Sequence, residues 1–192
     1  MPRLTAVAPI LLALPLAACF DAEMTLNVTD ENTAEATMVM IASEEVYQMA
    51  KSGDEPFCED GVEEKRDDGT YSCTETFTGS IDEALASPDI GDGLSIERRD
   101  GGLMFVSIDL TELTQDMTPP EEEGGEEMLA MMAGAFAGHA ITINIGGKKV
   151  EETNGTVSED GKTATLNIPL DKLFTGNADL PKSFDVLVEP GK

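Results

Sequence analysis

Alternating hydrophobic and polar positions dominate the first half of the chain and predict short antiparallel strands. Apolar side chains occupy every second position over residues 24–28 and again over residues 34–42, with an acidic turn between the two runs. Such alternation puts one set of side chains on a buried face, so the two runs predict a β-hairpin. A second hairpin is predicted from residues 94–99 and 103–110, because the Asp-Gly-Gly sequence at 100–102 is typical of a tight turn.

Shorter runs later in the chain predict the remaining strands. Glycine-containing dipeptides separate most of these runs, as expected for turns. Pro169 predicts that the strand before it ends at an edge of the sheet, since proline has no N–H to donate to a neighbouring strand. Residues 53–69 are polar and are interpreted as a surface loop. The predicted strands cover residues 70–78, 140–145, 149–153, 162–168 and 184–188.

Short helices are predicted between the strands. Ser43 and the Ser80-x-x-Glu83 sequence provide the hydroxyl and carboxylate groups that satisfy free N–H groups at a helix start. Asp171 is expected to cap a single helical turn in the same way. Residues 128–136 form the most apolar run, and because this run contains no charged side chain we expect a helix that is largely buried.

Together these elements predict an α+β fold in one domain. We expect an antiparallel, curved sheet of about seven to nine short strands, with about three or four short helices. Residues 1–18 are interpreted as a cleaved lipoprotein signal peptide and residues 19–23 as a lipidated N-terminus with a short tether. Residues 24–192 then form the single domain, since this length supports one hydrophobic core rather than two.

The first residues predict export and a lipid anchor. One basic residue, Arg3, precedes an apolar run that is shorter than the about 20 residues needed to cross a bilayer. The run ends in Leu-Ala-Ala-Cys at 16–19, the pattern of a bacterial lipobox. We therefore expect Cys19 to carry diacylglycerol and an N-acyl chain such as palmitate, which stabilise membrane attachment by about 0.8 kcal/mol per buried CH₂. The alternative is an ordinary secretory signal with an unrelated cysteine near the cleavage point.

The strongly acidic composition excludes one class of partner. The formal net charge is −26, with 38 acidic and 12 basic residues. Nucleic acid is not expected to bind, because its phosphates require lysine and arginine. Flat docking on an anionic membrane is disfavoured for the same reason. The acidic surface is better explained by solubility in a crowded cell envelope or a saline habitat.

Cys58 and Cys73 remain once Cys19 is assigned to the lipid anchor. Outside the cytoplasm a pair of cysteines is expected to form a disulfide bond. Closing a loop of this size stabilises the fold by about 3 kcal/mol when the lost entropy of the unfolded chain is considered. A metal pair or a redox-active dithiol is the alternative, but the chain has neither a C-x-x-C sequence nor a histidine near these cysteines.

Two regions of the sequence resemble the LppM-like family of bacterial lipoproteins. A hairpin rich in methionine and leucine directly follows the lipobox, and residues 154–158 (Asn-Gly-Thr-Val-Ser) and 160–166 (Asp-Gly-Lys-Thr-Ala-Thr-Leu) resemble turn-containing segments of the family. The family usually has an aromatic residue where Leu166 stands. The resemblance implies a non-enzymatic envelope domain with a sheet curved around helices, and it implies the binding of a lipid or glycolipid.

No catalytic or metal-binding residue is predicted. His139 is the single histidine, and its position between a predicted helix and a predicted strand indicates a helix-end residue rather than a general base. The nucleophile-elbow sequence and the His/Cys spacing of zinc sites are both absent. Acidic turns at 89–93 and 159–161 offer oxygen atoms for calcium, but neither matches the twelve-residue calcium-binding loop, and both are interpreted as solvated turns.

The methionine-rich helix provides the candidate ligand site. Methionine is flexible and polarizable, so it adapts to irregular apolar ligands such as acyl chains. We expect this helix to face the first hairpin across a curved sheet and to line an apolar cavity, although the same residues would also serve simply to fill a core. The candidate ligand-binding residues are Met38, Met40, Met128, Leu129, Met131, Met132 and Phe136.

These inferences predict a non-enzymatic lipoprotein of the bacterial cell envelope. It is expected to face the periplasm from the cell membrane or the outer membrane, without a cofactor beyond the lipid on Cys19. Its expected partner is a lipid, another apolar ligand or an envelope protein. The alternative is a structural or assembly lipoprotein with a closed core and an acidic interaction surface. A cavity of about a few hundred Å³ favours the first function, and dense packing favours the second.

Overall fold

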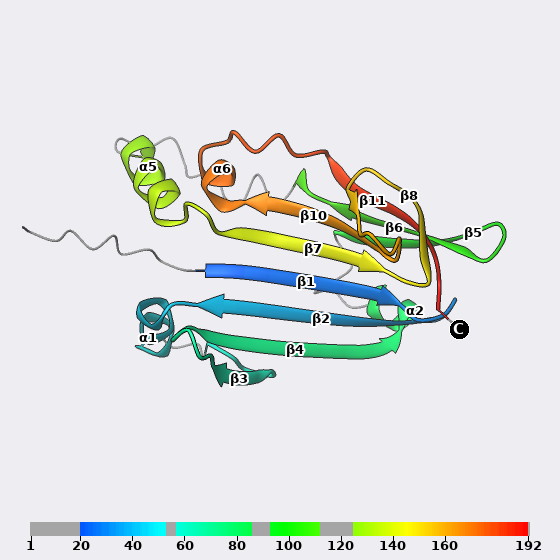
Figure 1. Cartoon of the computed structure of the whole chain (residues 1–192), viewed down its shortest axis with the longest axis horizontal. Helices are drawn as coiled ribbons and strands as arrows, with labels where there is room; N and C mark the ends of the chain where they lie inside the picture. Colours follow the sequence, from blue (N-terminus) through cyan, green and yellow to red (C-terminus); the bar gives the residue numbers. More distant parts are fainter. Residues whose placement is uncertain (1–19, 53–56, 86–92, 112–124, 192) are drawn as a thin grey trace, which may run out of the picture.

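Strands are the main secondary structure of the described chain. The computed structural model describes residues 20–52, 57–85, 93–111 and 125–191, and within these ranges eleven strands form two sheets (Figure 1). The larger sheet contains β1 (Phe20–Val28), β2 (Thr33–Ala42), β3 (Val62–Lys65), β4 (Tyr71–Ser80), β7 (Ala140–Gly146), β9 (Thr156–Val157) and β10 (Thr163–Pro169). The smaller sheet contains β5 (Leu94–Arg99), β6 (Leu103–Asp109), β8 (Lys149–Thr153) and β11 (Ser183–Glu189).

Four short helices accompany the sheets in the described ranges: α1 (Glu44–Ser52), α2 (Ile81–Leu85), α5 (Gly125–Ala135) and α6 (Leu170–Phe174). Helices α1, α5 and α6 lie at the end of the larger sheet where β1 begins, and α2 lies at the opposite end (Figure 1). Ser43 caps α1 as predicted, since its hydroxyl accepts a hydrogen bond from the Val46 N–H at 3.3 Å. The α+β fold class is therefore confirmed.

Long-range pairing joins the two halves of the chain within the larger sheet. The strand order is β3-β4-β2-β1-β7-β10-β9, and β1 pairs with β2 in antiparallel register but with β7 in parallel register. The smaller sheet has the order β5-β6-β11-β8 and is antiparallel throughout. Because β1 and β7 are far apart in sequence, no local turn fixes their pairing.

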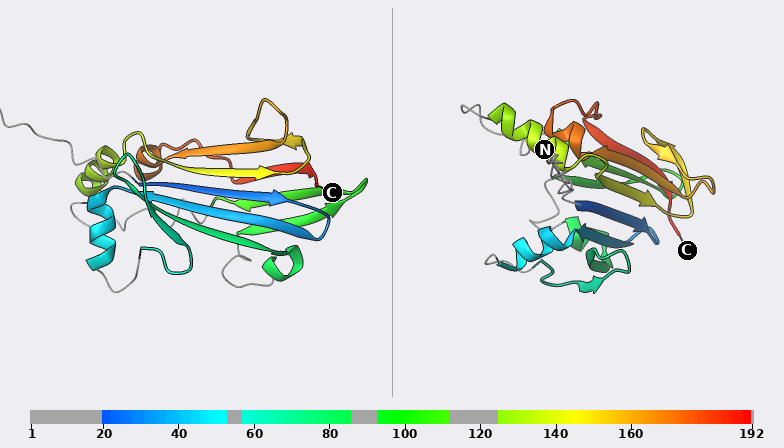
Figure 2. Two further views of the ribbon diagram at one scale, coloured as in Figure 1. Left: turned by 60° about the horizontal axis from the view of Figure 1, so that its bottom comes forward. Right: turned by 60° about the vertical axis from the view of Figure 1, so that its left-hand side comes forward.

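The hydrophobic core lies between the two sheets. Ile145 of β7 and Ile168 of β10 in the larger sheet, and Val186 of β11 in the smaller sheet, are all 0% exposed and belong to one cluster of buried residues. Figure 2 shows the smaller sheet against one side of the larger one. The opposite side of the larger sheet presents threonine and asparagine side chains, as when the Thr165 hydroxyl donates a 2.8 Å hydrogen bond to the Asn144 Oδ1 atom. Each fully buried aliphatic side chain stabilises this arrangement by about 1.5–3 kcal/mol.

The two segments that resemble the LppM-like family form turns around β9. The Asn154 side chain donates to the Ser183 carbonyl at 2.8 Å and accepts from the Asp185 N–H at 2.9 Å, so it holds β11. Gly155 packs so closely that an added Cβ would lie 2.6 Å from the Phe184 ring. Asp160 accepts a 2.7 Å hydrogen bond from the Ser158 hydroxyl, which helps keep the pKa of its carboxyl below the usual value. These two segments therefore stabilise the fold through hydrogen bonds and close packing.

Several sequence-based expectations differ from the structure. The strands number eleven among the described residues, rather than seven to nine, and the sheet that contains β1 and β7 is not purely antiparallel. Strand β3 lies within the predicted loop, and β1 already includes residues 20–23, which were assigned to a tether. Asp171 lies inside α6, whose N-cap is Pro169. Pro169 is the last residue of β10, as predicted. Strand β9 pairs only with Ala164 and Thr165, so no described strand residue pairs with Pro169 on that side of β10.

The burial of helix α5 differs most clearly from the prediction. It forms where the apolar run predicts it, but Met131 is 69% exposed. Ala130 and Gly134 are also exposed, while Leu129 and Met132 on the other side pack against the core. The prediction of a largely buried helix was therefore wrong for one face. The apolar pattern alone could not reveal that only one side of the helix has a partner.

Candidate functional site

An open apolar groove lies between the inner face of the larger sheet and strands β5 and β6. Its volume is about 640 Å³, within the range of about 300–1,000 Å³ that is typical of ligand pockets. Met38 is 43% exposed and Phe77 is 46% exposed, so the groove opens to solvent. Its apolar lining consists of Met24, Leu26, Ala34, Ala36, Met38, Phe77, Ile81, Leu94, Ile96 and Ile108.

The groove forms because only part of the inner face is covered. Met38, Met24 and Ile143 lie side by side on β2, β1 and β7. Ile143 is 6% exposed and belongs to the buried core cluster, whereas Met38, two strands away, is 43% exposed. The same row of side chains thus passes from the core into an accessible apolar surface.

Phe77 forms one wall of the groove because of Gly79. Both residues lie on the same face of β4, and an added Cβ at Gly79 would be 2.7 Å from the Phe77 Cζ atom. The ring therefore lies over the glycine and along the strand. A larger side chain at position 79 would displace this ring and change the shape of the groove.

A polar margin closes one side of the groove. Asp60 and Glu75 both contribute to the lining, together with the hydroxyl-bearing residues Thr37, Thr76 and Ser80. The segment that carries Asp60 lies close to β4, since a Cβ added to the neighbouring Gly61 would be 2.8 Å from the Glu75 Cγ atom. The Glu75 carboxylate and the segment that carries Asp60 therefore lie together beside the apolar lining, and we call these two residues the polar margin.

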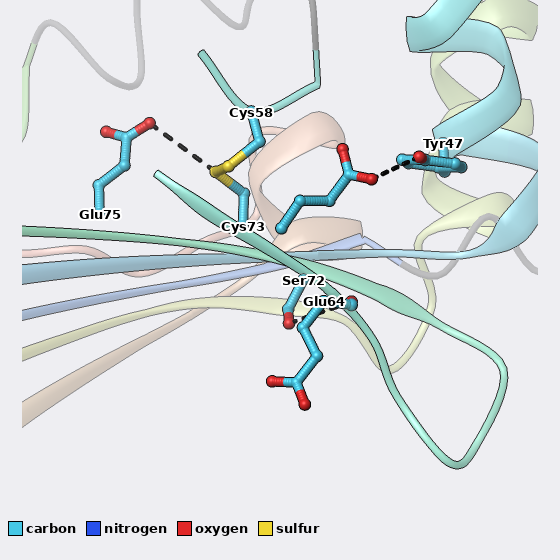
Figure 3. The surroundings of a disulfide bond; sticks show 7 residues. Tyr47, Cys58, Glu64, Ser72, Cys73 and Glu75 are labelled. Atoms are coloured by element: carbon cyan, nitrogen blue, oxygen red, sulfur yellow. Dashed lines mark hydrogen bonds between the residues drawn. A yellow bond between two sulfur atoms is a disulfide. The ribbon is translucent and has the colours of Figure 1, made fainter. Parts of the chain in front are cut away.

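A disulfide bond joins Cys58 to Cys73 beside this margin, and Figure 3 shows it next to Glu75. The two Cα atoms are 5.4 Å apart, and Cys73 is 0% exposed on β4. A Glu75 carboxylate oxygen lies 3.8 Å from the Cys73 Sγ atom, which is a contact rather than a donated hydrogen bond because a disulfide sulfur carries no proton. The predicted pairing of Cys58 with Cys73 is confirmed, and it fastens the segment that contains Asp60 to the sheet.

The structure places the predicted ligand-binding residues in different environments. Met38 lines the groove, and Met40 is half-buried one step further along the same face of β2. Leu129, Met132 and Phe136 pack against the core, and the Phe136 ring lies 5.2 Å from the Phe174 ring. Met131 projects into solvent. The side chain of Met128 lies outside the described part of the structure, and the binding role of the set stays a prediction.

Sequence reasoning did not find most of the groove residues. Met24, Phe77, Leu94, Ile96 and Ile108 were each recognised as strand residues, but none was assigned to a site. The signal was present as alternation, which shows that these side chains share a face. Alternation does not show which faces oppose one another, because β5 and β6 reach the larger sheet only through long-range packing.

His139 has a structural partner. Its Nδ1 atom lies 3.0 Å from the Asp21 Oδ2 atom, and the Ala140 N–H donates to the Asp21 Oδ1 atom at 2.9 Å. The backbone of His139 also accepts a 2.9 Å hydrogen bond from the Leu170 N–H. These contacts fasten the first residues of β1 to the junction between α5 and β7.

Neither a metal cluster nor a membrane span is found within the described residues. Histidine, cysteine and carboxylate side chains do not converge there in groups of three or more that could hold a metal ion. No described helix is long and apolar enough to cross a membrane. Cys19 and most of the acidic turn at 89–93 lie outside the described ranges. The turn at 159–161 uses its carboxylate at Asp160 for its own hydrogen bonds.

Comparison with known proteins supports the resemblance at the level of fold. Neither protein-family models nor curated proteins match the sequence. Among solved structures, the chain is similar to the folded domain of LppM from Mycobacterium tuberculosis, determined by NMR. The identity is 11%, the TM-score is 0.52, and the alignment covers 92% of each chain. At this identity the likeness concerns the fold alone, and the two proteins share that fold over nearly their whole described length.

Proposed function

We propose that this protein is a non-enzymatic lipoprotein of the bacterial cell envelope that holds an amphiphilic ligand in the groove between its sheets. The anchor is assigned to Cys19, at the end of the lipobox sequence. The disulfide bond supports an extracytoplasmic location, since such bonds persist in oxidising compartments. The fold shared with the LppM domain is consistent with this assignment.

The groove is the observation that carries the binding function. Its lining is mostly aliphatic and aromatic, and its methionines adapt to ligands of irregular shape. A protein gains about 25 cal/mol for each Å² of apolar surface removed from water. A ligand that covers the exposed part of this lining is therefore bound favourably. The apolar chain of an amphiphile can cover it in this way.

The polar margin restricts the head group of such a ligand. Asp60 and Glu75 would repel a phosphate or carboxylate placed beside them. Hydroxyl or cationic groups would instead be attracted to these carboxylates. A ligand with a sugar-like or cationic head and an apolar chain therefore fits better than an anionic phospholipid.

The alternative function, a structural or assembly lipoprotein, requires a closed core. The packing between β7, β10 and the smaller sheet has that character, but the region lined by Met38 and Phe77 does not. An acidic protein-interaction surface remains compatible with the net charge of −26. The groove favours ligand binding, because a purely structural role gives no reason to leave it open.

Native mass spectrometry of protein purified from its own membrane tests the binding function. The wild type is expected to carry a co-purifying amphiphile, and Met38→Arg is expected to lose it because the guanidinium would occupy the groove. Val39→Arg is the matched control, since Val39 lies on the opposite face of β2. Repeated isolation of empty wild-type protein, or retention of the ligand by Met38→Arg, would contradict the proposal.

Fractionation of cells tests the anchor separately. Cys19→Ser removes the thiol that accepts the lipid, so the variant is expected in the soluble envelope fraction while the wild type stays with the membrane. Continued membrane retention of Cys19→Ser would show that something other than the lipid at Cys19 holds the protein.

A further inference from the structure

The chain enters the described fold at a fixed point beside α5. Phe20 is the first residue of β1 and packs against the core. Asp21 is held by two contacts, 3.0 Å to the His139 Nδ1 atom and 2.9 Å to the Ala140 N–H. Cys19 is joined to Phe20 by one peptide bond, and adjacent Cα atoms are about 3.8 Å apart. A lipid on Cys19 would therefore be attached directly to the folded domain rather than through a long linker.

Two helices flank this point, and we call the region formed by Phe20, α1 and α5 the anchor end. The register pairs Phe20 with Ala42, and α1 begins at Glu44, directly after that partner. Helix α5 ends at Ala135, shortly before His139. Figure 1 shows both helices at the end of the larger sheet where β1 begins.

Among the described side chains of α5, those that point away from the core are uncharged. Leu129, Met132 and Phe136 recur at helical spacing and pack against the core. The exposed positions on the other side include Ala130, Met131 and Gly134, and Met131 is 69% exposed. The described part of this helix is thus apolar on both sides, although only one side is packed.

Helix α1 presents a second exposed methionine at the anchor end. Met49 is 72% exposed. The helix is fixed by Tyr47, which is 4% exposed and stacks on Tyr71 with ring centroids 3.7 Å apart. The Tyr47 hydroxyl also donates a 2.6 Å hydrogen bond to Glu63. Met49 therefore projects from a helix that Tyr47 packs against the sheet.

We propose that the anchor end docks on the surface of a lipid bilayer, with Met131 of α5 and Met49 of α1 inserted among the head groups. This inference rests on the proposed lipidation of Cys19, because the acyl chains would bring that end of the molecule to the membrane. Exposed apolar side chains on short helices bind the interfacial region of a bilayer in this way. The docking would fix the orientation of the domain and would direct the far end of the sheets away from the membrane.

The charges near the anchor end favour a zwitterionic surface. Glu44 and Glu45 lie exposed in the first turn of α1. Lys51 is the basic residue of the last turn of α1. Carboxylates next to anionic lipids are repelled, an effect that salt screens. We therefore expect closer contact with phosphatidylcholine than with phosphatidylglycerol at low salt, and similar contact at high salt.

Fluorescence quenching in reconstituted vesicles tests the docking. The lipidated full-length protein is placed in phosphatidylcholine vesicles that contain a lipid-linked quencher, and an environment-sensitive dye is attached to Met131→Cys, Met49→Cys or Asp100→Cys. The introduced thiol is the free one, since Cys58 and Cys73 are bonded to each other and Cys19 carries the lipid. Asp100 lies in the β5–β6 turn and serves as the matched exposed control.

The expected result is quenching at Met131→Cys and Met49→Cys that is at least about twofold stronger than at Asp100→Cys. Equal quenching at the three positions would overturn the docking proposal. Comparison with Cys19→Ser separates this outcome from failure of the anchor itself. If Cys19→Ser stays in the membrane fraction, the proposed lipidation is wrong; if it is released while wild-type quenching is equal at all three positions, only the docking is wrong.

Discussion

The two halves of the inner face of the larger sheet both carry apolar side chains, but these side chains differ in their exposure to solvent. In the covered half, on β7 and β10, Ile145 and Ile168 are 0% exposed and pack against β6 and β11. In the open half, on β2 and β4, Met38 and Phe77 are more than 40% exposed and line the groove. The difference arises from what lies opposite each strand, since strands in both halves carry apolar side chains on this face.

This difference separates the residues that stabilise the fold from those that are available for binding. A buried side chain in the covered half cannot move without leaving a cavity in the core. A side chain in the open half has water on one side, so its replacement leaves little new void. Substitutions in the covered half should therefore cost more stability than substitutions in the open half.

The sharpest comparison is a matched pair of alanine substitutions on one row of the sheet. Ile143→Ala is expected to lower the free energy of unfolding by about 2–5 kcal/mol, because it removes buried methyl groups and leaves a cavity. Met38→Ala is expected to lower it by only about 1 kcal/mol, because 43% of Met38 is already exposed and its truncation leaves little new cavity. Urea denaturation of both variants measures the two values, and equal losses would contradict the division into covered and open halves.

Loss of the disulfide bond is expected to weaken the open half. Replacing both Cys58 and Cys73 by alanine should lower the free energy of unfolding by about 3 kcal/mol, since the bond closes a loop with a sequence separation of 15. The same variant should lose affinity for apolar probes, because the segment that carries Asp60 would no longer be fixed beside the groove. Unchanged probe binding in a folded variant would show that this margin does not contribute to the site.

The turn that holds β11 provides a smaller effect in the covered half. Asn154→Ala removes hydrogen bonds to Ser183 and Asp185 and should cost about 1 kcal/mol. Thr156→Ala in the same turn region is the control, because that residue is exposed. Thermal unfolding of the two variants distinguishes a loss of specific hydrogen bonds from a general effect of shortening a side chain.

Substitution of Asp30 in the β1–β2 turn is expected to give the smallest change in stability. The dependence of this change on pH distinguishes it from other effects. Hydrogen bonds from the Thr33 hydroxyl and from the Asn32 and Thr33 N–H groups lower the pKa of this carboxyl below 3.8. A lowered pKa stabilises the fold above the unfolded value, and this contribution is lost as the pH falls through the folded value. The Tm difference between wild type and Asp30→Asn should therefore be largest above pH 3.8 and should shrink as the pH falls below 3.8 toward the lowered pKa of the folded protein. A difference that does not change with pH would contradict this.

The sequence predicted the elements whose formation is decided locally. Alternation gave the two hairpins, Ser43 gave the start of α1, and the pair of glycines at 101 and 102 gave a turn in which both have positive φ angles. The disulfide bond followed from the even number of cysteines that remain after Cys19. The hairpins, the helix start and the turn depend on residues that are neighbours in the chain, and the disulfide bond depends on the cellular compartment. Residue types indicate both the local structure and the compartment.

The remaining features depend on contacts between distant residues. The parallel pairing of β1 with β7 decides which strands form the covered half, and no local turn encodes it. Strand β3 has four exposed residues without alternation, and pairing with β4 beside the disulfide bond defines it. The groove is a consequence of the same long-range packing, so Met38 was predicted as a candidate while Phe77 and Ile96 were missed.

The most direct test of the account is a titration of methyl-labelled methionines observed by NMR. The mature chain with Cys19→Ser is titrated with decanol, whose hydroxyl head suits the polar margin, and with decanoate as the anionic control. The account predicts that decanol shifts the methyl signals of Met24 and Met38, that Met104, 1% exposed in the core, does not respond, and that decanoate acts more weakly. Unchanged signals from Met24 and Met38, or equal shifts at every exposed methionine, would contradict the claim that the open half of the sheet is a ligand site.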